Sequence, residues 1–219
     1  RHGRIRPSGA DQPRAGGGSF SQALSDGIAA AGAAGQLFVA AAGNNYGNDN
    51  DTNPVYPSSY DAANIIAVAA SDDKDEIADF SNFGATSVDL AAPGFNILSS
   101  TPGNTYSYYS GTSMAAPHVA GVAALLYSTA PEAGPQIIKQ WILDGVEVLP
   151  QWEGVVLTGG RLNAARALTM ADIHWLSESP EEGTLPQGES AQVHLTADAT
   201  GLDIGFMQSA QAGDRKSVV

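Results

Sequence analysis

One helix-forming stretch, GTSMAAPHVAGVAALLY from Gly111 to Tyr127, constrains the fold of this chain more than any other segment. From Met114 onward its side chains are nearly all small or apolar, on every face that a helix would have. A helix of that composition is typical of the centre of a domain, so we expect it to be buried all round. It begins with a polar Thr-Ser pair, at the end of a helix where unpaired backbone N–H groups and the positive end of the dipole meet.

The serine of this pair, Ser113, has two interpretations. As a cap, Thr112 or Ser113 would accept a hydrogen bond from a backbone N–H of the first helical turn. As a nucleophile, Ser113 would have its developing oxyanion stabilised by those same N–H groups. Gly111 favours the nucleophile because a residue without a side chain lets a substrate approach closely. For a serine at a helix start in general, the cap is the commoner role.

Three short apolar runs bounded by turn residues predict strands that are buried on both faces of a sheet. A helix precedes them, with a Ser-x-x-Gln capping box at Ser19 and Gln22 and a stop at Gly35. Helices that alternate with buried strands indicate an α/β fold, in which a parallel sheet is flanked by helices. The expected strands are 37–42, 64–71 and 87–94, and the expected helices are 19–34, 112–127, 136–143 and 162–170.

The two ends of the chain differ in texture from its middle. Residues 1–15 are rich in arginine and have neither helical nor strand periodicity, so we expect an atypical leader outside the fold. From residue 172 onward, Pro/Gly turns and an alternating strand at 191–197 predict the start of an all-β, sandwich-like module. The predicted domains are therefore the leader 1–15, the α/β part 16–171 and the β module 172–219 of a chain that we take to be a fragment.

Composition excludes several classes of function. A net charge of −13 opposes binding to nucleic acid. The absence of cysteine excludes disulfides, thiolate metal sites and cysteine nucleophiles. No apolar run is long enough to span a membrane, and the dispersed acidic residues favour a soluble protein that is either salt-tolerant or secreted.

The string GTSMAAPHVAG at 111–121 resembles the serine block of the subtilisin-like serine proteases, the subtilases. It differs from the Gly-x-Ser-x-Gly elbow of the α/β-hydrolases, because Ala115 stands where that pattern needs a glycine. FVAAAGNN at 38–45 resembles the oxyanion block of the subtilases, and GGRLNAARAL at 159–168 resembles the end of their catalytic domain. The resemblance covers residues 16–170, the C-terminal half of such a domain.

The resemblance implies that Ser113 is the nucleophile and that Asn44 donates its side-chain amide to the oxyanion. The position of Asn44, after an apolar strand and Gly43, agrees with this role. Open α/β sheets bind their ligands at the carboxyl ends of the strands. Taken alone, Asn44 could be a turn residue in the loop GNNYGNDNDTN.

A serine nucleophile needs a base, and none of the four histidines qualifies. His118 lies five residues beyond Ser113 on the same helix, a spacing that points its ring away from the hydroxyl. His174 and His194 fall in the predicted β module, and His2 lacks the pattern of the His block of the family. In the subtilases Asp and His precede the oxyanion asparagine. We therefore expect both from an N-terminal half of the catalytic domain that this chain lacks.

The resemblance also implies protein or peptide substrates, bound as an added strand between two walls. One wall would be formed by Gly16, Gly17 and Gly18, and the other by the segment that contains Ala41 and Gly43. The glycine triplet could equally be a flexible loop.

No cofactor is required for this chemistry, but the resemblance implies a structural calcium ion. Its ligands would be the backbone carbonyls of Ala63 and Ile65 and the carboxylate of Asp89, hard oxygen ligands that suit Ca²⁺. Asp89 could equally pair with a nearby basic group or cap a turn. The acidic loop 48–53 lacks the spacing of an EF-hand and is better explained as a solvated surface.

The sequence thus predicts a secreted serine endopeptidase that forms an acyl-enzyme on Ser113, with the fragment inactive by itself. Two alternatives remain: a non-catalytic subtilase-like scaffold that binds peptides or serves structurally, and another serine hydrolase such as an esterase. The intact Ser113 and Asn44 oppose the scaffold, and the missing second glycine of the elbow opposes the esterase.

Overall fold

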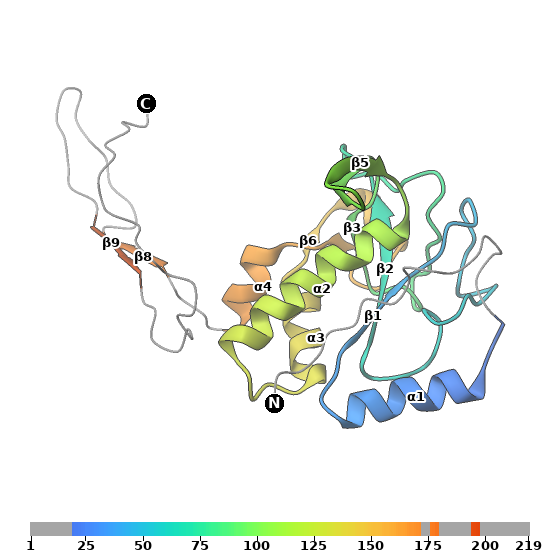
Figure 1. The fold of residues 1–219 in the computed structure, drawn as a ribbon, viewed down its shortest axis with the longest axis horizontal. Coiled ribbons are helices and arrows are strands. Elements are labelled where there is room, and N and C mark those ends of the chain that lie inside the picture. Colours follow the sequence, from blue (N-terminus) through green and yellow to red (C-terminus); the bar gives the residue numbers. More distant parts are fainter. Residues whose placement is uncertain (1–18, 172–175, 180–193, 198–219) are drawn as a thin grey trace. The chain divides into compact units, whose positions relative to one another are not determined.

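The computed structural model describes residues 19–171, 176–179 and 194–197 (Figure 1). The chain divides into two units between residues 173 and 174, and each is described by itself. That division lies two residues beyond the predicted boundary between residues 171 and 172. In the second unit β8 (Leu176–Ser179) and β9 (His194–Ala197) form an antiparallel pair, and β9 lies within the strand expected at 191–197.

A five-stranded sheet lies at the centre of the first unit, in the order β1-β2-β3-β7-β6. The first four strands of this order run parallel, and β6 pairs antiparallel with β7. The parallel sheet flanked by helices that the sequence predicts is therefore confirmed. The two strands that the sequence did not indicate have only two residues each. The bounds are β1 Phe38–Ala41, β2 Ile65–Ser71, β3 Leu90–Pro93, β6 Glu147–Val148 and β7 Gly160–Arg161.

One face of the sheet packs against three helices. Alternate residues of β1 and β2, among them Val39, Ile66 and Val68, point to this face because side chains alternate along a strand. They share one cluster of buried side chains with Ile142 of α3 and Ala167 of α4. The helices are α2 (Thr112–Thr129), α3 (Pro135–Asp144) and α4 (Ala164–Met170).

The opposite face of the sheet has two smaller clusters. Ala40 packs with Ile28 of α1 (Gln22–Ala33), and Ala69 packs with the fully buried ring of Trp152. The Trp152 indole N–H donates to the backbone carbonyl of Asp75 at 2.7 Å, which satisfies its polar atom in the core. Because both faces of the sheet are covered, all seven residues of β2 are buried.

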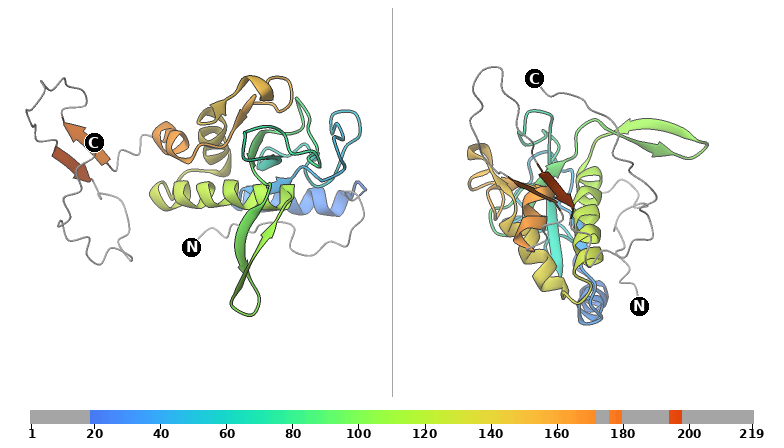
Figure 2. Two further views of the ribbon diagram at one scale, coloured as in Figure 1. Left: turned by 90° about the horizontal axis from the view of Figure 1, so that it is seen from above. Right: turned by 90° about the vertical axis from the view of Figure 1, so that its left-hand side faces the viewer.

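α2 is buried along one face only, whereas the sequence predicts burial all round. The buried face carries small residues such as Ala115 and Ala116, which let the helix backbone approach the strands that it runs beside (Figure 2). On the other side Pro117 and His118 are exposed, and Leu125 is 51% exposed. Composition could not distinguish the faces because both are apolar. No helix in the described ranges has both the length and the apolar character needed to cross a membrane.

A hairpin that the sequence analysis missed comes directly before α2. It consists of β4 (Ile97–Thr101) and β5 (Thr105–Tyr109), which pair antiparallel and project from the body of the unit (Figure 2). Its turn contains Gly103 and Asn104, both with positive φ, as tight hairpin turns require. Both strands are mostly exposed, so they lack the alternation of apolar and polar residues that marks a half-buried strand.

The start of α1 also differs from the prediction. Ser21, not Ser19, is the N-cap, and its hydroxyl accepts a hydrogen bond from the Leu24 N–H. Tyr60 fixes this position from outside the helix: its hydroxyl accepts from the Ser21 N–H at 2.9 Å and donates to the Ser21 carbonyl at 3.0 Å. A contact across 39 residues of sequence thus favours Ser21 over Ser19, the serine that the local Ser-x-x-Gln pattern selects.

Candidate active site

The carboxyl ends of the parallel strands meet at one edge of the sheet, and both predicted catalytic residues lie there. Asn44 follows the end of β1, separated from it by Ala42 and Gly43. Ser113 lies in the first turn of α2, which begins just after Gly111. The Gly111 N–H donates to the carbonyl of Gly94, the residue that follows β3, at 2.8 Å. The start of α2 is therefore anchored to the strand ends.

Thr112 joins the two predicted catalytic segments directly. Its backbone N–H and its hydroxyl both donate to the Asn44 side-chain oxygen Oδ1, at 2.9 and 3.0 Å. The same hydroxyl accepts a hydrogen bond from the Gly43 N–H at 3.2 Å. Because a backbone N–H can only donate, these contacts identify the Asn44 atom that faces Thr112 as the oxygen. The amide nitrogen Nδ2 of Asn44 is thereby directed away from Thr112.

Gly111 lies beside the Asn44 amide nitrogen and has no side chain to cover it. A Cβ atom at Gly111 would lie 3.4 Å from Asn44 Nδ2 and 3.7 Å from the sulfur of Met114. Gly111 provides no side-chain cap for α2, and the N–H of Thr112, the first residue of the helix, instead donates to Asn44 Oδ1. Asn44 and Ser113 are both exposed. An amide, a hydroxyl and a helix N-terminus therefore share one accessible place.

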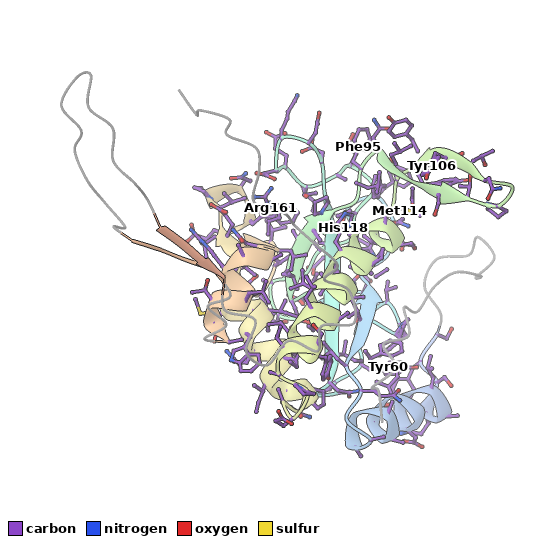
Figure 3. All side chains as sticks on the ribbon, turned by 60° about the vertical axis from the view of Figure 1, so that its left-hand side comes forward. Tyr60, Phe95, Tyr106, Met114, His118 and Arg161 are labelled. Carbon is purple, nitrogen blue, oxygen red and sulfur yellow. The ribbon has the colours of Figure 1, made fainter. Side chains whose placement is uncertain are left out.

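Among the described residues, His118 is the only histidine whose side chain is placed. Its Nδ1 lies 2.9 Å from the backbone carbonyl of Met114, one turn earlier on α2 (Figure 3). This contact binds one ring nitrogen of His118 to the backbone of its own helix, and that the ring points away from Ser113 stays a prediction from the spacing. His2 and His174 lie outside the described residues, and of His194 only the backbone in β9 is described.

Of the two predicted substrate walls, one is placed. Ala41 is the last residue of β1, and Gly43 follows with a φ of +115°, a conformation that favours glycine. Both are partly exposed at the edge of the sheet that carries Asn44. Gly16, Gly17 and Gly18 lie outside the described residues.

A lysine stands at the predicted calcium position. The Nζ atom of Lys139, on α3, forms a salt bridge of 3.0 Å with Asp89 Oδ1 and donates to the Ile65 carbonyl at 2.5 Å. The other Asp89 oxygen accepts from the Ala67 N–H at 2.7 Å, and Ala63 is exposed. Two of the three predicted ligands thus already hold an ammonium group, so they do not fit a calcium ion unless Lys139 leaves. Calcium binding at this place stays a prediction.

The ion pair of Asp89 and Lys139 is largely but not completely buried. The side chain of Asp89 is 10% exposed and that of Lys139 is 22% exposed. A cavity of about 340 Å³ opens beside them, lined by residues that include Ser58, Tyr60 and Leu157. In the described part of the chain no cluster of three or more His, Cys, Asp or Glu side chains could hold a metal ion.

A second carboxylate, Asp51, ties the loop after Asn44 to the segment before β3. It accepts hydrogen bonds from the backbone N–H groups of Thr86 and Ser87. Partial burial opposes its ionisation, but the hydrogen bonds from Ser87 and Thr86 outweigh that effect and lower the pKa of Asp51. Its contribution to stability is therefore present above its ordinary pKa and is lost as the pH falls through the lowered value.

The chain belongs to the subtilase family: the family model of the Subtilase family matches residues 7–167. This range includes Asn44 and Ser113, and it begins inside the segment 1–15 that composition sets apart as a leader. The family membership that the sequence predicts is confirmed.

Individual relatives agree with this assignment. The chain is 54% identical over 94 residues to a thermophilic serine proteinase of Bacillus sp. strain AK1, an alignment covering 43% of this chain and 22% of that protein. It is 40% identical over 164 residues to an extracellular protease of Xanthomonas campestris pv. campestris, covering 71% and 27%. Among solved structures, a protease from Pseudoalteromonas arctica is similar with a TM-score of 0.62 and 30% identity, covering 72% of this chain and 49% of that chain. The chain thus spans less than a third of these two curated relatives.

The contacts of Lys139 predict how the stability of a complete domain carrying this segment responds to its removal. Lys139→Met leaves the Asp89 carboxylate buried without its partner, so the free energy of unfolding should fall by about 3 kcal/mol in thermal or urea melts. Lys139→Met combined with Asp89→Asn should recover much of that loss. Lys74→Met, which changes an exposed lysine, is the matched control.

The same melts with and without a calcium chelator distinguish the Lys139 ammonium group from a calcium ion as the partner of Asp89. If Lys139 is the counter-ion of Asp89, chelator leaves the melting temperature of the parent unchanged. A melting temperature that falls with chelator in the parent, together with a Lys139→Met variant as stable as the parent, would assign the position to calcium instead.

Proposed function

We propose that the complete protein is a secreted, subtilisin-like serine endopeptidase in which Ser113 is the nucleophile and Asn44 donates to the oxyanion. The observation that carries the proposal is the pair of hydrogen bonds from Thr112 to Asn44 Oδ1. They hold the Asn44 oxygen at Thr112, and the amide nitrogen lies beside Gly111, two residues before Ser113. Family membership and relatives named as proteases support the class of reaction, and the relative named as an extracellular protease supports secretion.

In the proposed reaction the Ser113 hydroxyl oxygen attacks the carbonyl carbon of a peptide bond and loses its proton to a base. The carbonyl oxygen becomes an oxyanion, which accepts hydrogen bonds from Asn44 Nδ2 and from the backbone N–H of Ser113. The C–N bond then breaks, the departing amine takes up the proton, and an ester to Ser113 remains. Water hydrolyses the ester and restores the serine.

The base and its orienting carboxylate are proposed to come from a segment that this chain does not contain. One ring nitrogen of His118 is already bound to the Met114 carbonyl of its own helix. The described residues offer no second histidine side chain. Substrate is proposed to lie beside β1, along the segment of Ala41 and Gly43, as an added strand.

In a complete enzyme carrying this segment, Ser113→Ala should abolish hydrolysis of a peptide substrate because the nucleophile is gone. Asn44→Ala should lower kcat by about 10²- to 10³-fold, with little change in KM, because the lost donor acts chiefly in the transition state. Ser128→Ala, an exposed serine near the other end of α2, is the control and should leave both constants unchanged. Near-parental turnover of either active-site variant would contradict the assignment.

The 219-residue chain expressed alone should show almost no protease activity, because loss of the base costs about 10⁴- to 10⁶-fold in rate. Casein cleavage by the chain is compared with cleavage by its Ser113→Ala variant, and the two rates should be equal. Labelling of Ser113 by a fluorophosphonate, followed by mass spectrometry, gives a second measurement. Cleavage or labelling that depends on Ser113 would show that the chain contains a base.

Covalent labelling of the complete protein also decides between the proposed enzyme and the two alternatives. A non-catalytic scaffold would not react with the fluorophosphonate at Ser113. An esterase would react but would cleave ester substrates while leaving peptides intact.

A further inference from the structure

We propose that Asn82 is a positioning residue for the oxyanion donor, an inference that rests on the proposed function of Asn44. Asn82 lies in the segment between β2 and β3, far in sequence from both catalytic segments. It is fully buried, with 0% of its surface exposed. A buried primary amide is costly unless its donors and acceptor are satisfied, so its partners indicate what it does.

The partners of Asn82 bracket Asn44 on both sides. On the N-terminal side of Asn44, the Asn82 backbone N–H donates to the Gly43 carbonyl at 2.9 Å, and the Asn82 side-chain nitrogen donates to the Ala42 carbonyl at 3.1 Å. After it, the side-chain oxygen accepts the Asn45 N–H at 2.7 Å. One side chain and its own backbone thus hold the residues on either side of the oxyanion donor.

Gly43 makes this close contact possible. Its φ of +115° favours glycine, and a Cβ atom there would lie 2.5 Å from the amide nitrogen of Asn82. Any side chain at residue 43 would push Asn82 away from the loop. The buried amide of Asn82 can therefore lie here only because residue 43 is a glycine.

Asn50 supports Asn82 from the other end of the same loop. It is 1% exposed, its Nδ2 donates to the Ala42 carbonyl at 2.9 Å, and its Oδ1 accepts from Asn82 Nδ2 at 3.0 Å. Asn82 itself is anchored to the sheet through its neighbour: the Ser81 hydroxyl accepts from the Ala70 N–H of β2 and donates to the Asn82 carbonyl. The loop that carries Asn44 is thereby connected to β2 through side chains, although it lies beyond the strand pairing.

The consequence concerns the direction of the Asn44 amide. Thr112 fixes the side-chain oxygen, but the amide can point correctly only if the backbone of residue 44 is also fixed. An oxyanion donor loses effect when it is displaced by fractions of an ångström, since its role depends on preorganisation. Asn82 is thus a positioning residue that touches neither substrate nor oxyanion and acts through Asn44.

A double-mutant cycle in a complete enzyme carrying this segment tests this role. Asn82→Ala should lower kcat about 10-fold or more, with little change in KM. Combined with Asn44→Ala it should lower kcat no further than Asn44→Ala alone, because a residue that acts through Asn44 has nothing left to position. Losses that multiply in the double variant would overturn the positioning role.

The matched control is Asn64→Ala. Asn64 is also a buried asparagine, 3% exposed, and its side chain donates to the carbonyls of Ile28 and Gln36. It lies just before β2, at the opposite end of the strands from Asn44. Its removal should lower the melting temperature but leave kcat unchanged, and an equal fall in kcat for Asn64→Ala would also count against the proposal. If Asn82→Ala does not fold, Asn50→Ala enters the same cycle with the same expectation.

The cycle also separates this proposal from the proposed function. If Asn44→Ala by itself leaves kcat unchanged, the oxyanion role of Asn44 is wrong and the positioning role falls with it. If Asn44→Ala lowers kcat strongly while Asn82→Ala lowers it independently, only the positioning role is wrong.

Discussion

The contact between Thr112 and Asn44 is the interaction on which the candidate site depends. Thr112 is fully buried, and its N–H and hydroxyl both donate to the Asn44 side-chain oxygen. The helix start and the strand end belong to segments far apart in the sequence, so their juxtaposition requires the packing of α2 on β1, β2 and β3 in the correct register. A shift of α2 by one residue would turn Thr112 out of the core and separate Ser113 from Asn44.

That packing depends on small side chains. Alanines on the buried face of α2, such as Ala115 and Ala116, share one buried cluster with Ala70 of β2 and Ala92 of β3. Close approach of helix and sheet leaves little space between them, so larger side chains at these positions would force the helix away. The apolar composition that first indicates a central helix thus has a geometric purpose, although only one face of α2 is buried.

The elements that could be predicted from the sequence were those with a local cause. The buried strands are continuous apolar runs, and the predicted catalytic segments carry long motifs around Ser113 and Asn44. Elements decided by distant contacts could not be predicted. Tyr60 selects Ser21 as the cap of α1, and the exposed hairpin before α2 has no buried face to produce an alternating pattern.

The motif around Asp89 does not indicate its salt-bridge partner. The sequence around Asp89 matches the family, but the partner of its carboxylate is Lys139, which lies on α3. Only the folded chain brings these two residues together. Asn82 and Asn50 were missed for a related reason. In a polar loop, a buried asparagine that organises backbone cannot be told from a solvated turn residue, because the two differ only in what covers them.

The hydrogen bonds that hold the backbone around Asn44 are made by neutral groups: the amides of Asn82 and Asn50, the hydroxyl of Thr112 and backbone carbonyls. Such groups do not titrate between mild acid and mild alkali, and dissolved ions hardly screen their contacts. The shape of the loop that carries Asn44 should therefore be insensitive to ionic strength and to pH, down to the acidity at which Asp51 takes up a proton. In an assembled enzyme of this kind, the dependence of turnover on pH would then report the base alone, on a framework of constant geometry.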